Sequence, residues 1–232
     1  MNVVEFKKIN GIVGPNIYYL KIEVTNLSKT LNDMLKVLSD LSWLSKFNEE
    51  YMKNSFKSKV DKTVNFLIKL FEEDEKNNLV LKSGEYIVSE LSREAIVSKL
   101  NYLDIPLMEL LGKKTIGNPG FDFITENKSE KIIIFGEAKY LSSTNAYDDA
   151  LEQINDFISK SKDIEELSDM DKFCSKSALI NADIGIKGFA AAFSVTNIKT
   201  DTLLKNIQKN QNFIKLLKYK EIILVGVCIK IL

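Results

Sequence analysis

Apolar residues recur along the chain with two periods, and each change of period marks the boundary of an expected element. Spacings of three and four residues predict helices, and the first helix starts after Asn26, a typical capping residue. Short alternating or continuous apolar runs predict strands. Helices are expected at 27–44, 60–71, 83–103, 145–161 and 200–219, and strands at 3–24 (two strands joined by a turn), 120–125, 131–140, 177–184, 187–195 and 221–232.

The order of these elements favours an α/β fold with a mixed central β-sheet flanked by helices. A β-hairpin and a helical extension come first, and the polar run at 72–78 breaks the helical pattern as a linker would. We therefore expect an N-terminal hairpin and helical region at 1–78, which is a candidate surface for a partner, and a core at 79–232.

The composition of the 232 residues is that of a folded chain without a strong electrostatic field. Apolar residues make up 45%, and 32 basic side chains balance 32 acidic ones. DNA binding would therefore depend on a local patch or on a partner. The segment MNVVEFKKIN lacks the apolar core of a signal peptide, and EIILVGVCIKIL is too short to span a bilayer. These features predict a soluble cytoplasmic protein without a membrane partner.

The chain contains no histidine, which excludes several classes of chemistry. Ser-His-Asp and Cys-His nucleophiles, histidine general bases and histidine-ligated zinc all need an imidazole. Cys174 and Cys228 lie far apart without a Cys-x-x-Cys spacing, so they indicate neither a zinc ribbon nor a disulfide framework. Catalysis by this chain would have to use carboxylates, lysine and a hard metal ion.

The run IIIFGEAK at 132–139 has the composition of a buried strand but ends with charged residues. Side chains alternate across a strand, so Glu137 and Lys139 share one face with the apolar Ile133 and Phe135. Apolar residues also fill most of the other face, as in a central strand that is covered on both sides. Charges at such a place are costly unless a partner compensates them.

The preceding segment FDFIT has the same anomaly, because Asp122 stands between two phenylalanines. The polar stretch ENKSEK between the two segments suits a hairpin turn. If the hairpin folds between Ser129 and Glu130, Asp122 and Glu137 lie nearly opposite each other, with side chains about 5 Å apart.

Paired buried carboxylates such as Asp122 and Glu137 repel unless one is protonated or a cation lies between them. Mg²⁺ or Mn²⁺ fits this position because hard cations prefer oxygen ligands. Lys139 would reach the same point, where it could position or help deprotonate water and offset charge that develops on a phosphoryl group. The alternative is a buried salt bridge, in which Lys139 pairs with one of the carboxylates and performs no chemistry.

These residues resemble the motif of the PD-(D/E)xK nuclease superfamily, which is an Asp on one strand followed by Glu-x-Lys on the next. Here the motif reads GFD at 120–122 and GEAK at 136–139. The resemblance implies a restriction-endonuclease-like core and a metal-dependent nuclease. It further implies that Asp122 and Glu137 are catalytic and bind the metal, and that Lys139 is catalytic.

Residues outside the motif are candidates for catalysis and DNA binding. The resemblance implies a further acid on the preceding helix, where Glu94 is preferred to Glu90, four residues earlier on the same face. Gln153 is similar to the glutamine that holds the substrate end in RecB-like members of the superfamily, although the tyrosine that follows it there is absent. Lys113 and Lys114, which precede the motif, are expected to meet the phosphate backbone of DNA.

At a finer level, residues 83–160 resemble the HamA nucleases of Hachiman anti-phage defence systems. That resemblance implies a DNA nuclease held inactive by a helicase partner of the HamB type and released when the helicase detects damaged or invading DNA. Other interpretations stay open, namely a stand-alone restriction-type endonuclease and a non-catalytic DNA-binding subunit on a nuclease-like fold.

Overall fold

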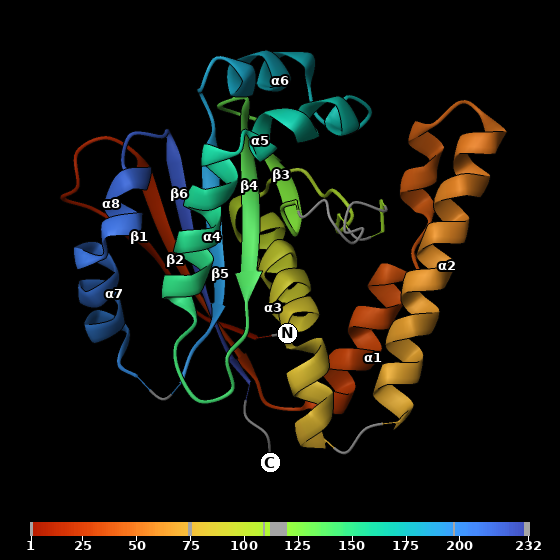
Figure 1. Ribbon diagram of the computed structural model, residues 1–232, viewed down its shortest axis with the longest axis horizontal. Helices are drawn as coiled ribbons and strands as arrows, with labels where there is room; N and C mark the ends of the chain where they lie inside the picture. The colour runs from red at the N-terminus through yellow and green to blue at the C-terminus, as the bar shows by residue number, and fades with distance from the viewer. Residues whose placement is uncertain (1, 74–75, 109, 112–119, 197, 230–232) are drawn as a thin grey trace.

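A central sheet of six strands organises the computed structural model, which describes residues 2–73, 76–108, 110–111, 120–196 and 198–229 (Figure 1). The strand order is β1-β2-β6-β5-β4-β3. The pairs β2/β6, β6/β5 and β5/β4 are parallel, whereas β1/β2 and β3/β4 are antiparallel. The expected mixed central sheet is therefore confirmed. The strands are β1 (Asn2–Ile9), β2 (Asn16–Val24), β3 (Phe123–Asn127), β4 (Ile132–Lys139), β5 (Gly188–Ser194) and β6 (Glu221–Ile229).

Helices cover the sheet, and polar side chains cap the start of some of them. Asn26 caps the first helix as expected, because its side-chain oxygen accepts a hydrogen bond from the N–H of Lys29 at 2.9 Å. The prediction of a strand at 177–184 is wrong, because this segment forms a helix. The side chain of Ser175 caps that helix by accepting a hydrogen bond from the N–H of Ala178. The helices are α1 (Leu27–Leu38), α2 (Glu50–Glu73), α3 (Lys76–Leu100), α4 (Tyr147–Ser159), α5 (Lys162–Glu165), α6 (Lys176–Asp183), α7 (Thr200–Lys209) and α8 (Gln211–Leu216), with the 3₁₀ helices η1 (Ser42–Lys46) and η2 (Glu166–Met170). Every helix in the described ranges is too short or too polar to cross a bilayer.

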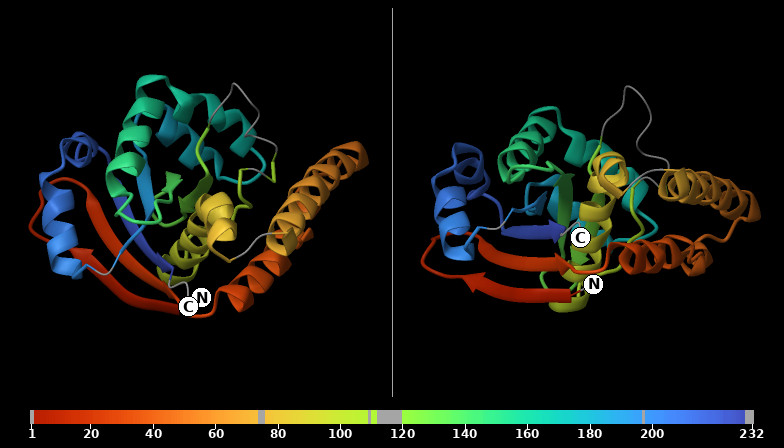
Figure 2. Two further views of the ribbon diagram at one scale, coloured as in Figure 1. Left: turned by 60° about the horizontal axis from the view of Figure 1, so that its bottom comes forward. Right: turned by 90° about the horizontal axis from the view of Figure 1, so that it is seen from below.

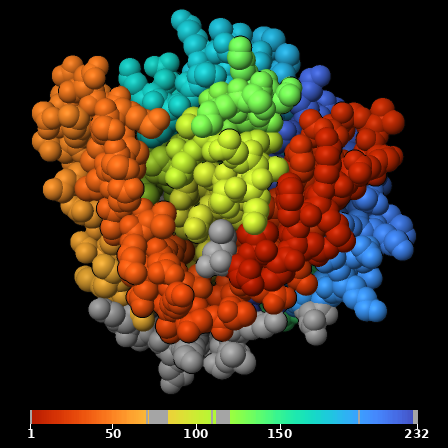
Figure 3. Space-filling view, turned by 180° about the vertical axis from the view of Figure 1, so that it is seen from behind, coloured from red at the N-terminus to blue at the C-terminus, as the bar shows by residue number. Residues whose placement is uncertain are grey.

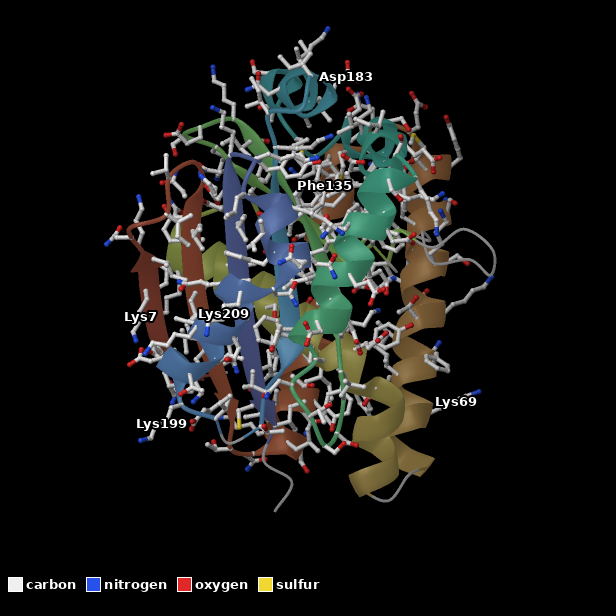
Figure 4. The ribbon with its side chains drawn as sticks, turned by 60° about the vertical axis from the view of Figure 1, so that its left-hand side comes forward. Lys7, Lys69, Phe135, Asp183, Lys199 and Lys209 are labelled. Atoms are coloured by element: carbon white, nitrogen blue, oxygen red, sulfur yellow. The ribbon has the colours of Figure 1, made fainter. Side chains whose placement is uncertain are left out.

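Apolar side chains on the two faces of the sheet form separate cores. Residues of α4, α6, α7 and α8 pack on one face, and residues of α1, α2 and α3 pack on the other. Figure 4 shows Phe135 of β4 inside the molecule near α4, whereas Lys7, Lys199 and Lys209 lie at the outer surface. Strand β4 is thus covered on both faces, as its composition predicts.

The N-terminal hairpin continues the same sheet. Strand β2 pairs with β6 in parallel register from Asn16 opposite Glu221 to Val24 opposite Ile229. Figure 2 shows that α2 lies at the opposite side of the molecule from α7 and α8. Seen from behind, the α1–α2 region and the β1–β2 hairpin lie on either side of the yellow-green end of α3 (Figure 3). The boundary at residue 78 stays a prediction.

Candidate active site

The hairpin of β3 and β4 has the register that the sequence predicts. Phe123 pairs with Gly136, and the pairing continues to Asn127 opposite Ile132. Extending this register by one residue places Asp122 opposite Glu137. The N–H of Asp122 donates a hydrogen bond of 2.9 Å to the carbonyl of Gly136, which continues the pairing beyond the end of β3.

Both carboxylates of this opposed pair are buried. Asp122 and Glu137 are each 1% exposed. One oxygen of Asp122 accepts a hydrogen bond of 2.6 Å from the N–H of Ala138, which fixes the carboxylate against β4. Gly136 makes room for this packing, since a Cβ there would lie 2.2 Å from the ring of Phe123. The strand therefore has its glycine where the opposite phenylalanine covers it.

Lys139 joins Glu137 to an acid on α3. Its ammonium lies 2.9 Å from a carboxylate oxygen of Glu137 and 3.4 Å from one of Glu85. Helix α3 comes this close because Gly84 has no side chain, and a Cβ there would lie 2.3 Å from the ring of Tyr140. The structure thus gathers side chains from β4 and α3 at the carboxyl end of β4, where the tip of its arrow lies beside α3 (Figure 1).

The charges around Lys139 keep it protonated. Burial lowers the pKa of its ammonium, but the nearby carboxylates of Glu137, Glu85 and Asp122 raise it by more, and the net shift is upward. An ammonium with a raised pKa is a poor base at neutral pH. The geometry therefore favours a role in positioning and charge stabilisation over proton abstraction.

Neither of the glutamates that sequence reasoning considered on α3 contacts Lys139. Glu90 is buried and forms a two-pronged ion pair with Arg93, at 2.6 and 2.8 Å. Glu94 lies nine residues beyond Glu85, about 13 Å along the helix axis. There it lines a pocket with Arg93. The structure does not bring Glu94 together with Asp122 and Glu137. Sequence reasoning missed Glu85, for which the signal was its neighbour Gly84, a glycine inside a helix.

The backbone around Asp122 is held from two sides. The N–H of Met108 donates to the carbonyl of Asp122 at 3.1 Å, and the N–H of Leu103 donates to that of Glu126 at 2.9 Å. The segment that follows α3 therefore lies along the free edge of β3. On the other side, a buried carboxylate oxygen of Glu166 accepts from the N–H of Phe121 at 2.9 Å. Sequence reasoning also missed Glu166, because nothing local relates η2 to a residue 45 positions earlier.

The residues expected to bind DNA are Gln153, Lys113 and Lys114, and the structure describes the first of them. Gln153 is half-buried on α4, one turn before Phe157, whose ring packs edge-on against Phe121 at 5.1 Å between centroids. Helix α4 therefore packs over the residue next to Asp122. Lys113 and Lys114 lie outside the described residues.

The donor set of this site suits a hard divalent cation. Asp122 and Glu137 supply buried carboxylate oxygens on one face of the hairpin. Mg²⁺ usually takes only one or two protein carboxylates and fills its other positions with water and substrate oxygens. Within the described ranges, no three or more Asp, Glu, Cys and His side chains group closely enough to hold a metal by themselves. The pair fits Mg²⁺ or Mn²⁺ bound together with a substrate better than a closed structural site.

Comparisons with known proteins place this arrangement in no family. No protein-family model matches the chain. Neither the curated proteins nor the solved structures gave a significant match. The function therefore has to be argued from the site itself.

Proposed function

We propose that this chain is a metal-dependent deoxyribonuclease that hydrolyses phosphodiester bonds. The observation that carries the proposal is the hairpin register, which brings Asp122 opposite Glu137 and leaves Lys139 at 2.9 Å from Glu137. Burying two carboxylates together is costly. The ammonium of Lys139 compensates the charge of Glu137, and a metal ion held between the two carboxylates would compensate the pair. Mg²⁺ or Mn²⁺ is the proposed cofactor.

The proposed roles follow from the position of each group. Asp122 and Glu137 hold the metal, which supplies Lewis acidity and lowers the pKa of water when bound. Lys139 keeps a positive charge beside the carboxylates, where it orients the attacking water and offsets charge on the phosphoryl oxygens. Glu85 holds Lys139 from α3 at 3.4 Å and replaces Glu94 in our proposal as the helix acid.

The proposed substrate and partner follow from the resemblance and from the charge of the chain. A formal net charge of zero predicts weak, salt-sensitive binding of DNA by the chain alone. A helicase partner that delivers DNA would supply the missing affinity. We therefore propose a DNA nuclease that is the effector subunit of an anti-phage defence complex and is controlled by such a helicase.

The proposal is tested by incubating the purified chain with linear and with circular DNA, with Mg²⁺ or with chelator, alone and with the protein encoded next to it. Cleavage that needs Mg²⁺ and increases with the neighbouring protein supports the proposal. Sequence-specific cuts by the chain alone would instead identify a stand-alone restriction-type endonuclease. Absence of Mg²⁺-dependent cleavage under every condition contradicts the proposal.

One observation favours a second candidate, a non-catalytic DNA-binding subunit. Lys139 and Glu137 form a close ion pair, and Asp122 accepts a hydrogen bond from Ala138, so the same contacts would also serve as a structural brace. Calorimetric titration with Mn²⁺ separates the two functions. A brace binds no Mn²⁺, whereas a nuclease site binds it and loses it when Asp122 is replaced by Asn.

Glu85→Gln is expected to lower the cleavage rate by about tenfold, the lower end of the range for residues that orient a metal site. The substitution keeps the hydrogen-bonding shape but removes the charge that holds Lys139 from the helix. Glu94→Gln, on the same helix, is the matched control and should leave the rate unchanged. Both rates are measured on the same DNA. A slower rate for Glu94→Gln with an unchanged rate for Glu85→Gln would contradict this assignment and make Glu94 the helix acid.

A further inference from the structure

Helices α7 and α8 carry a concentrated positive charge that the proposed catalytic site does not use. Of the 32 basic and 32 acidic residues, six lysines and one acid lie at 199–220, which gives this segment a formal charge of +5 and leaves −5 on the rest of the chain. All six lysines are exposed, and together they are called the α7–α8 lysine face: Lys199, Lys205, Lys209, Lys215, Lys218 and Lys220. A chain without net charge therefore has one strongly basic surface.

Packing of the two helices turns these lysines outward. The apolar positions of both helices are buried in the core on this side of the sheet, namely Leu203, Leu204, Ile207, Phe213 and Leu216. Lysines that alternate with such a stripe face away from the sheet. Figure 4 shows Lys199 and Lys209 at the outer surface, on the same side of the molecule as Lys7.

The positive charge of this face is not balanced by neighbouring acids. Within the described ranges, none of the six lysines forms an ion pair with a carboxylate. Asp201, the one acid of the segment, lies 3.5 Å from Lys7, which also pairs with Glu5 at 2.6 Å. Asp148 of α4 accepts a hydrogen bond from the side-chain amide of Asn210. These acids have partners of their own, so the lysines keep their charge for a ligand.

The other side chains of this face favour a polyanion over a protein or a membrane. The exposed residues between the lysines are mostly amides and hydroxyls, such as Thr202, Asn206 and Gln208. In the fully described stretch 199–220, Ile214 is the only large apolar side chain that is exposed. Stable protein interfaces have an apolar core, and amphipathic helices insert an apolar face into a membrane. Ammonium and amide groups instead donate to phosphate oxygens.

The aromatic residues of the segment favour duplex DNA over a single strand. Single strands are usually held by stacking of their bases on exposed rings. Phe213 is buried and Tyr219 is half-buried, with Lys218 over its ring at 5.2 Å. The face therefore offers charge to a backbone without a stacking platform.

We propose that the α7–α8 lysine face binds the phosphate backbone of double-stranded DNA outside the catalytic site. Figure 1 shows α4 between these helices and β4, so the lysines would contact phosphates away from the bond that is cut. The inference deepens the proposed function and rests on it for the choice of DNA as the ligand. It supplies the local patch that DNA binding by a chain without net charge requires.

The test compares two triple variants of the full chain that lose the same charge. Lys205→Gln/Lys209→Gln/Lys215→Gln changes the face, whereas the matched control Lys29→Gln/Lys99→Gln/Lys176→Gln changes exposed lysines on α1, α3 and α6. Each is titrated with a fluorescent duplex of about 20 base pairs, in chelator and at several salt concentrations. The control should bind like the unaltered chain. The variant of the face should bind about tenfold or more weakly at low salt, and its plot of log affinity against log salt should flatten by about one for each lysine removed.

Three results would overturn the proposal. These are equal binding by the two triple variants, no binding of the duplex by the unaltered chain at low salt, and binding of the unaltered chain to vesicles of anionic lipid but not to the duplex. Chelator separates this test from the proposed nuclease. Weaker binding by the variant of the face, with no Mg²⁺-dependent cleavage by any of the proteins, contradicts the nuclease and keeps the DNA-binding face. Cleavage together with equal binding by both variants contradicts only the face.

Discussion

Glu137→Gln is expected to lower the rate of Mg²⁺-dependent DNA cleavage by about 10²–10³-fold, the effect of removing one charge-stabilising group from an active site. The substitution preserves the size of a side chain that is 1% exposed and removes the charge that faces Asp122. The fold should persist, because Lys139 keeps its contact with Glu85. The cleavage rate is measured on plasmid DNA, and the fold is checked by circular dichroism.

Lys139→Met provides the second arm of this experiment. It removes the ammonium but keeps the length of the side chain, and it should reduce cleavage to a similar degree. Glu152→Gln on the exposed face of α4 is the matched control for a lost carboxylate. Cleavage at the wild-type rate by both Glu137→Gln and Lys139→Met would contradict the proposed site.

Arg93→Met is expected to lower the free energy of unfolding by about 3–5 kcal/mol, which is the cost of leaving a buried charge without its partner. Glu90 is 1% exposed and takes both of its shortest contacts from the guanidinium of Arg93. Burial raises the pKa of Glu90, and Arg93 counteracts that rise. Without Arg93 the folded-state pKa rises further, so the variant loses stability as pH increases above the unfolded pKa. Urea unfolding should show a larger loss at pH 8 than at pH 5.

The double variant Glu90→Met/Arg93→Met tests the reason for that loss. Replacing both members of a buried ion pair by apolar side chains of similar volume is often neutral. The double variant should therefore regain most of the stability that Arg93→Met loses. If the double variant loses as much stability as Arg93→Met or more, the ion pair does not explain the effect.

The candidate hairpin could be predicted from the sequence because its information is local. The polar turn fixes where the chain reverses, and the strand period of two then fixes which residues face each other. The structure confirms that register from Phe123 opposite Gly136 to Asn127 opposite Ile132. Helix caps also depend on neighbouring residues, and Asn26 caps α1 as its side chain predicts.

Features that depend on how distant elements meet could not be predicted. Spacing shows that Glu90 and Glu94 share a helix face, but it does not show where α3 lies along β4. The contact of Gly84 with Tyr140 sets that position. That contact brings Glu85 to Lys139. Short apolar runs are ambiguous between strand and helix. For this reason the sequence predicts a strand at 177–184, whereas the segment forms α6.

The parallel pairing of β2 with β6 has a consequence for the order of folding. This pairing joins residues near the start of the chain to residues about 200 positions later, from Asn16 opposite Glu221 to Val24 opposite Ile229. The β3–β4 hairpin closes a short loop and can form early, whereas β2 must wait until β6 has been synthesised. The hairpin can therefore pair Asp122 with Glu137 before the sheet is complete. Pairing of β2 with β6 is then the step that joins the N-terminal hairpin to the rest of the sheet.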